Sequence, residues 1–194
     1  RMNEYSMMTQ ELQDLAALSM EHGQIPSGLY DQYHVLRGLR DVNGKGVLAG
    51  LTDISTITSS KEVDGKMVPC DGELRYRGYD IHDLVDGFVA EQRFGYEEVA
   101  YLLIFGRLPQ KQELQEFQNL LGSYRTLPTN FVRDVIMKAP SADLMISLTR
   151  SVLTLASYDD GISDSSLQTV LMQCMKLISE MPMLAVYGYH SYNH

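Results

Sequence analysis

The sequence contains only two cysteines, Cys70 and Cys174, and no CxxC pair. A disulfide-stabilised scaffold of 194 residues would use more, so this content is typical of a reducing compartment. Each cysteine is interpreted as a small buried apolar side chain rather than a nucleophile. The first residues carry Glu4, Glu11 and Asp14 and no long apolar run, which argues against a secretory signal or transit peptide. We therefore expect a cytoplasmic protein.

Basic residues are also few, because 16 Lys and Arg stand against 25 Asp and Glu, for a formal net charge of −9. Such a chain repels a phosphate backbone unless its cations are clustered, and the sequence holds no basic run. No stretch approaches the ~18 apolar residues of a membrane span. These features predict neither a nucleic-acid partner nor a membrane partner. Hydrophobic residues still make up 44% of the chain, which is enough for a substantial core.

Recognisable catalytic and ligand-binding motifs are lacking as well. Lys45 stands between Gly44 and Gly46, but the first glycine of a P-loop and its closing Ser or Thr are absent. The same glycines lead into an expected strand, so a dinucleotide fingerprint, which must open a helix, is rejected. His190 and His194 have the spacing of two zinc ligands on a helix, but no third ligand accompanies them. We predict no metal site, and these residues alone assign no catalytic group.

The spacing of apolar residues predicts a mainly α-helical fold with a small β-ribbon near the N-terminus. We expect three parts: an N-terminal helix and loop over 1–34, a small β-region over 35–79 and a helical portion over 80–194. The N-terminal helix is expected over 3–22.

The β-ribbon is expected within 52–77, where β-forming residues surround the hairpin dipeptide Asp64-Gly65. Pro69 indicates an edge strand or a break in a strand, because proline has no N–H to donate. Asp71-Gly72 indicates a second turn.

Beyond Gly78 the pattern becomes helical and remains so. Asp80 is expected to cap the first helix, and Gly106 is placed as a C-terminal capping glycine. Ser141 is the expected start of one later helix, and Asp164 or Ser165 the start of the last. The expected helices cover 80–86, 96–105, 110–124, 129–138, 141–157 and 164–190.

The helices expected over 141–157 and 164–190 are apolar on more than one face. Two interpretations remain open, the interior of a large domain and a subunit interface. Pro182 should kink the second helix, because it removes one backbone hydrogen bond.

The run Asp71-Gly-Glu-Leu-Arg-Tyr-Arg-Gly-Tyr-Asp80 continues with Ile81-His-Asp-Leu84 and is followed by Tyr96-Glu-Glu-Val-Ala-Tyr-Leu-Leu-Ile-Phe-Gly106 and Leu108-Pro109. This series resembles the citrate synthase family, whose members carry GxLxYRGYxIxxL and then FEEVAYLLLFGxLP. The resemblance covers nearly all of 35–192 and implies the multi-helical large domain of that family, with its small β-region. The chain departs from the family at Gln110, where a threonine often caps the next helix.

The resemblance implies a carbon–carbon bond-forming acyltransferase that joins acetyl-CoA to oxaloacetate and water, giving citrate and CoA at the entry of the tricarboxylic acid cycle. In the family an Asp removes a methyl proton, one His stabilises the enol and a second His polarises the ketone, without a metal. Those groups lie in later motifs, including GPxHGG, which this chain lacks. We therefore expect an N-terminal fragment, truncated before the catalytic half, that contains no catalytic residue and is inactive alone. No tightly bound cofactor is implied, since acetyl-CoA is a substrate of the full-length parent.

One binding residue is carried over from the family. Arg40 aligns with a family arginine that contacts a phosphate of coenzyme A, and a guanidinium suits phosphate. The alternative is an ordinary solvated arginine.

Alternatives to citrate formation also remain open. The parent could be a methylcitrate synthase that uses propionyl-CoA, or the chain could be a non-catalytic helical assembly module. In the family the dimer is built from antiparallel helices that correspond to 141–157 and 164–190. We predict a homodimer through these helices, with Leu148, Val152, Leu171 or Met175 in its interface.

Overall fold

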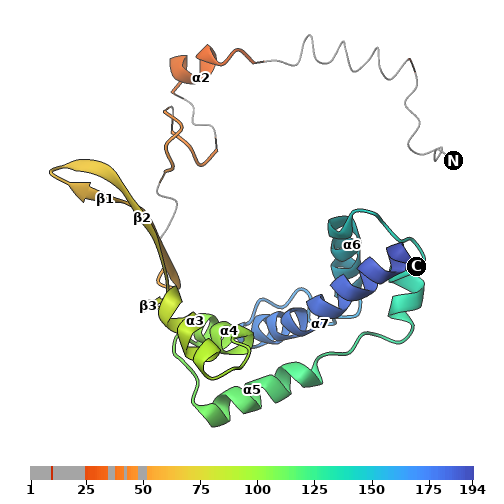
Figure 1. The fold of residues 1–194 in the computed structure, drawn as a ribbon. Helices are drawn as coiled ribbons and strands as arrows, with labels where there is room; N and C mark the ends of the chain where they lie inside the picture. The colour runs from red at the N-terminus through yellow and green to blue at the C-terminus, as the bar shows by residue number, and fades with distance from the viewer. Residues whose placement is uncertain (1–9, 11–24, 35–37, 42, 48–51) are drawn as a thin grey trace. The chain divides into compact units, whose positions relative to one another are not determined.

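The structure, a computed structural model, describes residues 10, 25–34, 38–41, 43–47 and 52–194. The chain divides into two compact units, 1–52 and 53–194, and the second holds the β-hairpin and the long helices (Figure 1). The mainly α-helical class with a small sheet is confirmed. The helix expected over 3–22 lies outside the described residues except for Gln10. The expected boundaries at 34 and 79 stay predictions.

The first unit contains one short helix, α2 (Gly28–Gln32), within its described residues. Further along, Arg40 and Gly46 pair as an isolated antiparallel bridge. This small closed turn lies within the small β-region expected over 35–79.

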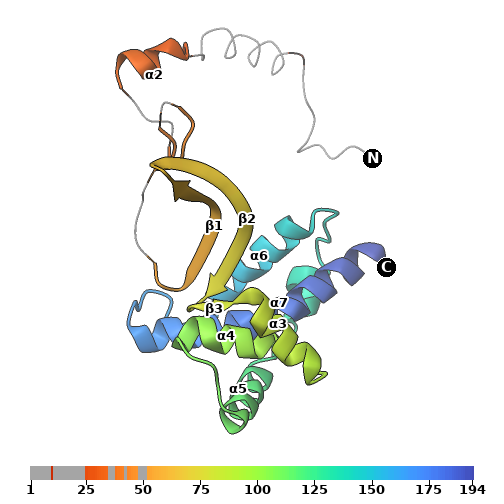
Figure 2. The ribbon, with the colours of Figure 1, turned by 60° about the vertical axis from the view of Figure 1, so that its left-hand side comes forward.

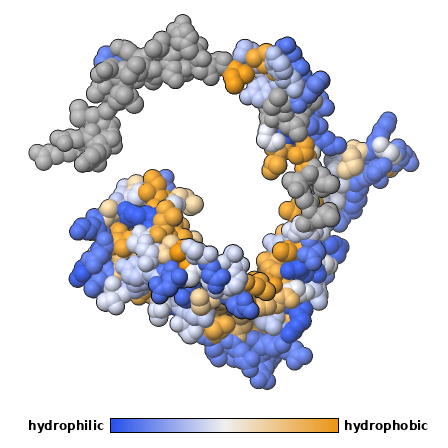
Figure 3. Space-filling view, turned by 180° about the vertical axis from the view of Figure 1, so that it is seen from behind, coloured by the Kyte–Doolittle hydropathy of each residue, from blue (hydrophilic) through white to orange (hydrophobic). Residues whose placement is uncertain are grey.

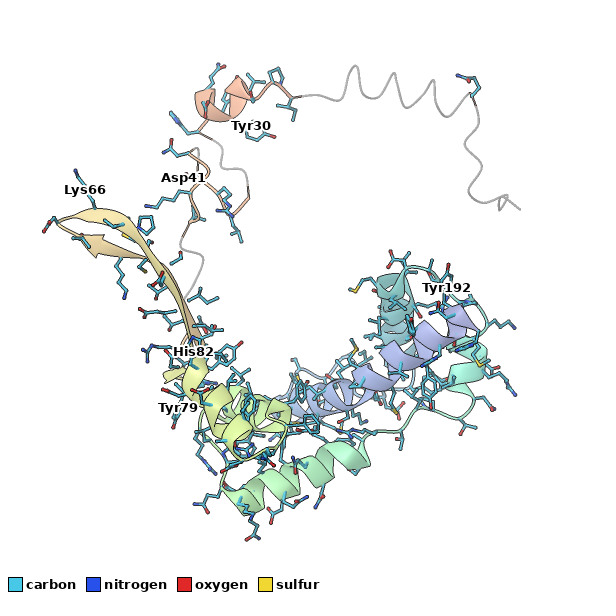
Figure 4. The ribbon with its side chains drawn as sticks, viewed as in Figure 1. Tyr30, Asp41, Lys66, Tyr79, His82 and Tyr192 are labelled. Atoms are coloured by element: carbon cyan, nitrogen blue, oxygen red, sulfur yellow. The ribbon has the colours of Figure 1, made fainter. Side chains whose placement is uncertain are left out.

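The second unit begins with a long hairpin, β1 (Ser55–Val63) and β2 (Lys66–Tyr76), which pair antiparallel. Asp64 and Gly65 form the turn and both have positive φ, at 51° and 73°. Two consecutive positive φ values match the right-handed twist of paired strands, which is why Asp-Gly favours this turn. The expected hairpin is confirmed. Lys66 lies at its far end in Figure 4.

The second turn expected at Asp71-Gly72 is wrong, because β2 continues through these residues. The register shifts there instead: Thr58 pairs with Glu73 and Ser60 with Pro69, so residues 70–72 lie opposite Ser59 alone. Extra residues on one strand form a bulge that bends the ribbon, and the hairpin is strongly curved in Figure 2.

The base of the hairpin leads directly into the helical part. β3 (Tyr79–Asp80) pairs with the end of β2, and α3 (Ile81–Ala90) follows at once. The Asp80 carboxylate accepts a hydrogen bond from the backbone N–H of His82 at 2.9 Å, which confirms the expected N-cap. Tyr79 and His82 mark this junction in Figure 4.

α4 (Tyr96–Phe105) and α5 (Lys111–Ser123) follow the sequence pattern closely. Gly106 ends α4 with φ 80° and donates to the Leu102 carbonyl at 2.8 Å, as expected of a capping glycine. At the family departure Gln110, a capping box forms: its side chain accepts from the backbone N–H of Glu113, whose carboxylate accepts from the N–H of Gln110. A glutamine therefore starts α5 where the resemblance leads one to expect a threonine.

The helix expected over 129–138 is shorter and of a different type, the π-helix η2 (Val132–Ile136). The N–H of Met137 donates to the Val132 carbonyl, five residues earlier, at 2.9 Å. Asn130 has a positive φ of 63°, so a regular helix does not extend through it.

The two long helices are α6 (Leu144–Ala156) and α7 (Leu167–Asn193). Asp143 caps α6, not Ser141, and Ser166 caps α7, not Asp164 or Ser165. Asp164 instead accepts a hydrogen bond from the Ser166 hydroxyl at 2.9 Å, so it orients the capping side chain. α7 runs on past Pro182 as a single helix.

Two small apolar cores hold the helices together. In the first, Phe117 and Leu121 of α5 pack against Met175 of α7. In the second, Phe131, Ile136 and Leu184 are buried, and half-buried residues of α6 pack against them. α7 belongs to both cores, because its first half faces α5 and its second half faces η2 and α6.

Candidate functional site

Arg40 lies in a closed turn whose backbone is held by Asp41. The Asp41 carboxylate accepts hydrogen bonds from the N–H groups of Asn43 and Lys45 at 2.9 and 3.0 Å, and the Asp41 N–H donates to the Lys45 carbonyl at 2.8 Å. Gly44 has a positive φ of 76°, which suits this tight turn. Gly44 therefore serves the geometry of this turn.

The Arg40 side chain itself is exposed, and among the described residues it donates one hydrogen bond, to the Gly44 carbonyl at 3.3 Å. A guanidinium carries five donors, so most of its donors remain available to an anion. This geometry agrees with a phosphate contact and equally with a solvated arginine. The assignment of Arg40 to coenzyme A stays a prediction.

The second candidate surface is the apolar exterior of α6 and α7. Met145, Ile146 and Leu153 project from α6, with Met145 and Leu153 at 69% and 68% exposure. On α7, Leu167 is 79% exposed, and further apolar residues follow along the helix. Figure 3 shows orange hydrophobic residues between blue ones on the rear face of the helical part. Exposed apolar side chains that gather on one part of a protein surface are typical of an interaction surface.

The four side chains predicted for the dimer interface lie elsewhere. Met175 is buried in the chain's own first core, and Leu148, Val152 and Leu171 are half-buried against the two cores. Their sequence stripe therefore marks the inner faces of α6 and α7. An interface through these helices would use the opposite, exposed faces.

A pocket of about 430 Å³ opens between α6, α7 and the loops that follow α5 and α6. Val152 and Leu177 form part of its apolar wall, while Lys176 and Glu180 provide the charged groups on α7. Burial raises the pKa of the half-buried Glu180 carboxyl, and the nearby Lys176 ammonium offsets part of this effect. No sequence signal indicated this pocket, because it is formed by segments far apart along the chain.

The loop beside this pocket is tied to α7. The Gln173 amide donates to the Asp159 carboxylate at 2.8 Å and to the Gly161 carbonyl at 3.3 Å. Asp159 also accepts from the Gly161 N–H at 2.9 Å. These bonds fix one wall of the pocket.

The absence of a metal site stays a prediction. Within the part of the chain that the structure describes, no three His, Cys, Asp or Glu side chains come together as metal ligands, and the His190 and His194 rings stack instead at 5.6 Å.

The expectation that no stretch is apolar enough for a membrane span is wrong. An 18-residue window of α7 reaches a mean hydropathy of 1.2, so this helix is long and apolar enough to cross a membrane, by length and composition only.

Comparison with known proteins identifies the family. The family model described as citrate synthase, C-terminal domain, matches residues 38–194. The citrate synthase of Corynebacterium glutamicum is 31% identical over 137 residues, which are 69% of this chain and 30% of that protein. The citrate/2-methylcitrate synthase of Bacillus subtilis is 26% identical over 148 residues, or 76% of this chain and 36% of that protein. The chain belongs to the citrate synthase family.

A solved structure supports the same relationship. The citrate synthase of Pyrobaculum aerophilum is similar with a TM-score of 0.60 and 30% sequence identity, over 77% of this chain and 35% of that one. The chain thus spans about a third of the length of these relatives. Its membership of a family of acyltransferases is established, and the expected family resemblance is confirmed.

Proposed function

We propose that this chain is part of a longer citrate synthase, which joins acetyl-CoA to oxaloacetate and water and releases citrate and CoA at the entry of the tricarboxylic acid cycle. The family match over 38–194 is the observation that supports this most strongly. The 194-residue chain alone is proposed to be inactive, because it lacks the later family motifs that hold the catalytic Asp and His. Its two unpaired cysteines support a cytoplasmic location.

The test is the consumption of acyl-CoA thioester by the longer protein in the presence of oxaloacetate. Citrate synthase activity requires acetyl-CoA to be consumed faster than propionyl-CoA. The reverse preference would favour the methylcitrate synthase, an alternative supported by the similarity to the Bacillus subtilis protein named for both products. No consumption of either thioester would contradict both.

Arg40 is proposed to contact a phosphate of coenzyme A, because its guanidinium is exposed and makes a single hydrogen bond to the described residues. Removing one charge-assisted contact costs about tenfold in affinity. In the longer protein, Arg40→Gln should therefore raise KM for acetyl-CoA with little change in kcat. Arg133→Gln, a change of another exposed arginine, serves as the control. An unchanged KM for Arg40→Gln would show an ordinary solvated arginine.

We further propose a homodimer formed through the exposed faces of α6 and α7. The apolar area that these faces leave in water supports it, since covering apolar surface is favourable at about 25 cal/mol per Å². Sedimentation of the purified chain at tens of micromolar tests it (an order of magnitude for an interface of standard size). A monomer throughout this range would contradict the dimer.

The rival function is a non-catalytic assembly module. The same apolar faces of α6 and α7 would suit it. The reading frame beyond His194 distinguishes the two: a His-Gly-Gly motif downstream supports the enzyme, and a stop codon supports the module.

A further inference from the structure

The pocket between α6 and α7 combines an apolar wall with charged groups, and all of its lining residues belong to the second compact unit, 53–194. Leu155 and Leu177 are part of the apolar wall, and Lys176 and Glu180 line the pocket from α7. Its volume of about 430 Å³ lies within the range of about 300–1,000 Å³ that is usual for sites of small organic molecules. The pocket therefore has the size and the mixed lining of a small-molecule site.

The Glu180 carboxylate is half-buried, and it forms no hydrogen bond and no salt bridge with the residues that the structure describes. Lys176 precedes it by one helical turn, and its ammonium acts on this carboxylate only through space. A carboxylate that is partly removed from water without a partner is costly, and a cation bound beside it would lower that cost. Glu180 therefore favours a positively charged ligand.

The second carboxylate of the lining, Asp159, already has partners. It accepts hydrogen bonds from the Gln173 amide at 2.8 Å and from the Gly161 N–H at 2.9 Å, so it holds the pocket wall in place. Glu180 is thus the carboxylate that remains available to a ligand. In the described lining one ammonium, Lys176, stands against these two carboxylates, and this balance disfavours a ligand that is anionic overall.

Two tyrosine rings, Tyr124 and Tyr158, complete the lining. The Tyr158 ring packs edge-on against Phe131 of the second core, with 6.2 Å between the ring centroids, so it is anchored in the fold. The face of an aromatic ring attracts an organic cation and also packs against apolar groups. A molecule with a cationic end and an apolar body would therefore find a partner for each part.

We propose that this pocket binds a small molecule with a primary ammonium group on an apolar body, the ammonium beside Glu180 and the body against Leu155 and Leu177. Two kinds of ligand share this chemistry, a simple amine and a free amino acid with an apolar side chain. The carboxylate of an amino acid would in addition pair with Lys176, which lines the pocket about 6 Å along α7 from Glu180. This inference depends neither on the proposed enzymatic reaction nor on the homodimer.

Three probes with the same aromatic body test the ligand class: phenethylamine carries only the ammonium, 3-phenylpropionate only the carboxylate, and phenylalanine both. Their binding to the 194-residue chain is measured by ligand-observed NMR titration. Phenethylamine should bind at least about tenfold more tightly than 3-phenylpropionate, because only the amine can pair with Glu180. Tighter binding of phenylalanine than of phenethylamine would identify an amino acid as the ligand, and the reverse order a simple amine.

Two variants locate the bound probe. Glu180→Gln keeps the shape of the side chain and removes its charge, so it should weaken the binding of phenethylamine at least about tenfold. Its control is Glu116→Gln on the exposed side of α5, which should leave the affinity unchanged. Ala156→Leu places a larger side chain in the pocket wall and should weaken all binding there. Circular dichroism confirms that each variant is folded.

Three results would overturn the inference. The first is no binding of phenethylamine or phenylalanine up to about 10 mM, a range in which even weak sites are detected. The second is binding of 3-phenylpropionate as tight as that of phenethylamine. The third is an affinity for phenethylamine that is unchanged in Glu180→Gln or in Ala156→Leu, since the probe would then lie elsewhere. None of these results bears on citrate formation, which the thioester assay tests separately.

Discussion

Gly188 of α7 packs directly against Ser147 of α6: a Cβ atom at Gly188 would lie 3.0 Å from the Ser147 hydroxyl oxygen. Ser147 is buried, and its carbonyl accepts a hydrogen bond from the Ser151 hydroxyl at 2.8 Å, so the buried Ser151 hydroxyl has its partner within α6. Small residues at this crossing let the two helix backbones approach closely. The close packing of α7 on α6 therefore depends on residue 188 being a glycine, which has no side chain.

Gly188→Val should lower the free energy of unfolding by about 1–3 kcal/mol, because the added side chain overpacks the crossing. The control is Gly122→Val, since a Cβ at this glycine of α5 meets no other atom within 4 Å. The sequence has no tryptophan, so unfolding is best followed by circular dichroism. Equal stabilities of the two variants would contradict a close α6–α7 crossing.

Arg77 links the start of the hairpin to the end of α4. Its guanidinium donates to the Asp53 carboxylate and to the Leu103 carbonyl, both at 3.0 Å. Arg77→Met should cost about 1–2 kcal/mol of unfolding free energy, because it leaves a partly buried carbonyl without its donor. Arg133→Met is the control, since Arg133 forms only an exposed pair with Asp134, worth less than about 1 kcal/mol. A loss no larger than that of the control would show that Arg77 is not a structural link.

The pair Arg107–Glu113 predicts a response to acid. The Arg107 guanidinium and the Gln110 N–H hold the pKa of Glu113 down to about 2, from an ordinary 4.5. Because the pKa of Glu113 is lower in the folded chain than in the unfolded chain, its ionised carboxylate stabilises the fold at a pH above 4.5. This stabilisation is lost as the pH falls towards 2. Glu113→Gln should therefore be less stable than the wild type at neutral pH, with the difference shrinking through that window. A difference that is independent of pH would contradict the pairing.

Glu180 predicts the opposite response. Burial raises the pKa of Glu180 above its ordinary 4.5, so the folded chain holds this proton more tightly than the unfolded chain. Ionisation of Glu180 then lowers stability as the pH rises through and beyond 4.5. Glu180→Gln should match the wild type in acid and exceed its stability at neutral pH. Glu116→Gln, on the exposed side of α5, should show no such gain. A loss of stability for Glu180→Gln at neutral pH would contradict this account.

Local signals in the sequence were sufficient to predict those elements whose structure depends on contacts between residues close together in the chain. Asp64-Gly65 forms the hairpin turn, Asp80 caps α3 and Gly106 ends α4, as their residue types predict. In each case the deciding hydrogen bond or dihedral angle lies within a few residues. The motifs on this framework were also sufficient to indicate the family.

Features that depend on distant contacts were not predictable. Asp71-Gly72 has the composition of a turn, but pairing with β1 converts it into a bulge. The sequence showed that α6 and α7 are apolar on several faces without showing which face is inward, and Met175 proved to be buried within the chain. The pocket beside Glu180 is formed by four separate segments, so no local pattern marks it.

The central claim, that this chain is part of a citrate synthase, is tested most directly by CoA release. Thiol release from acetyl-CoA is measured with oxaloacetate for the 194-residue chain and, side by side, for the longer protein that contains it. The account predicts oxaloacetate-dependent release and citrate formation by the longer protein, with the 194-residue chain at the level of the buffer blank. Absence of release by the longer protein, or measurable citrate formation by the 194-residue chain alone, would contradict it.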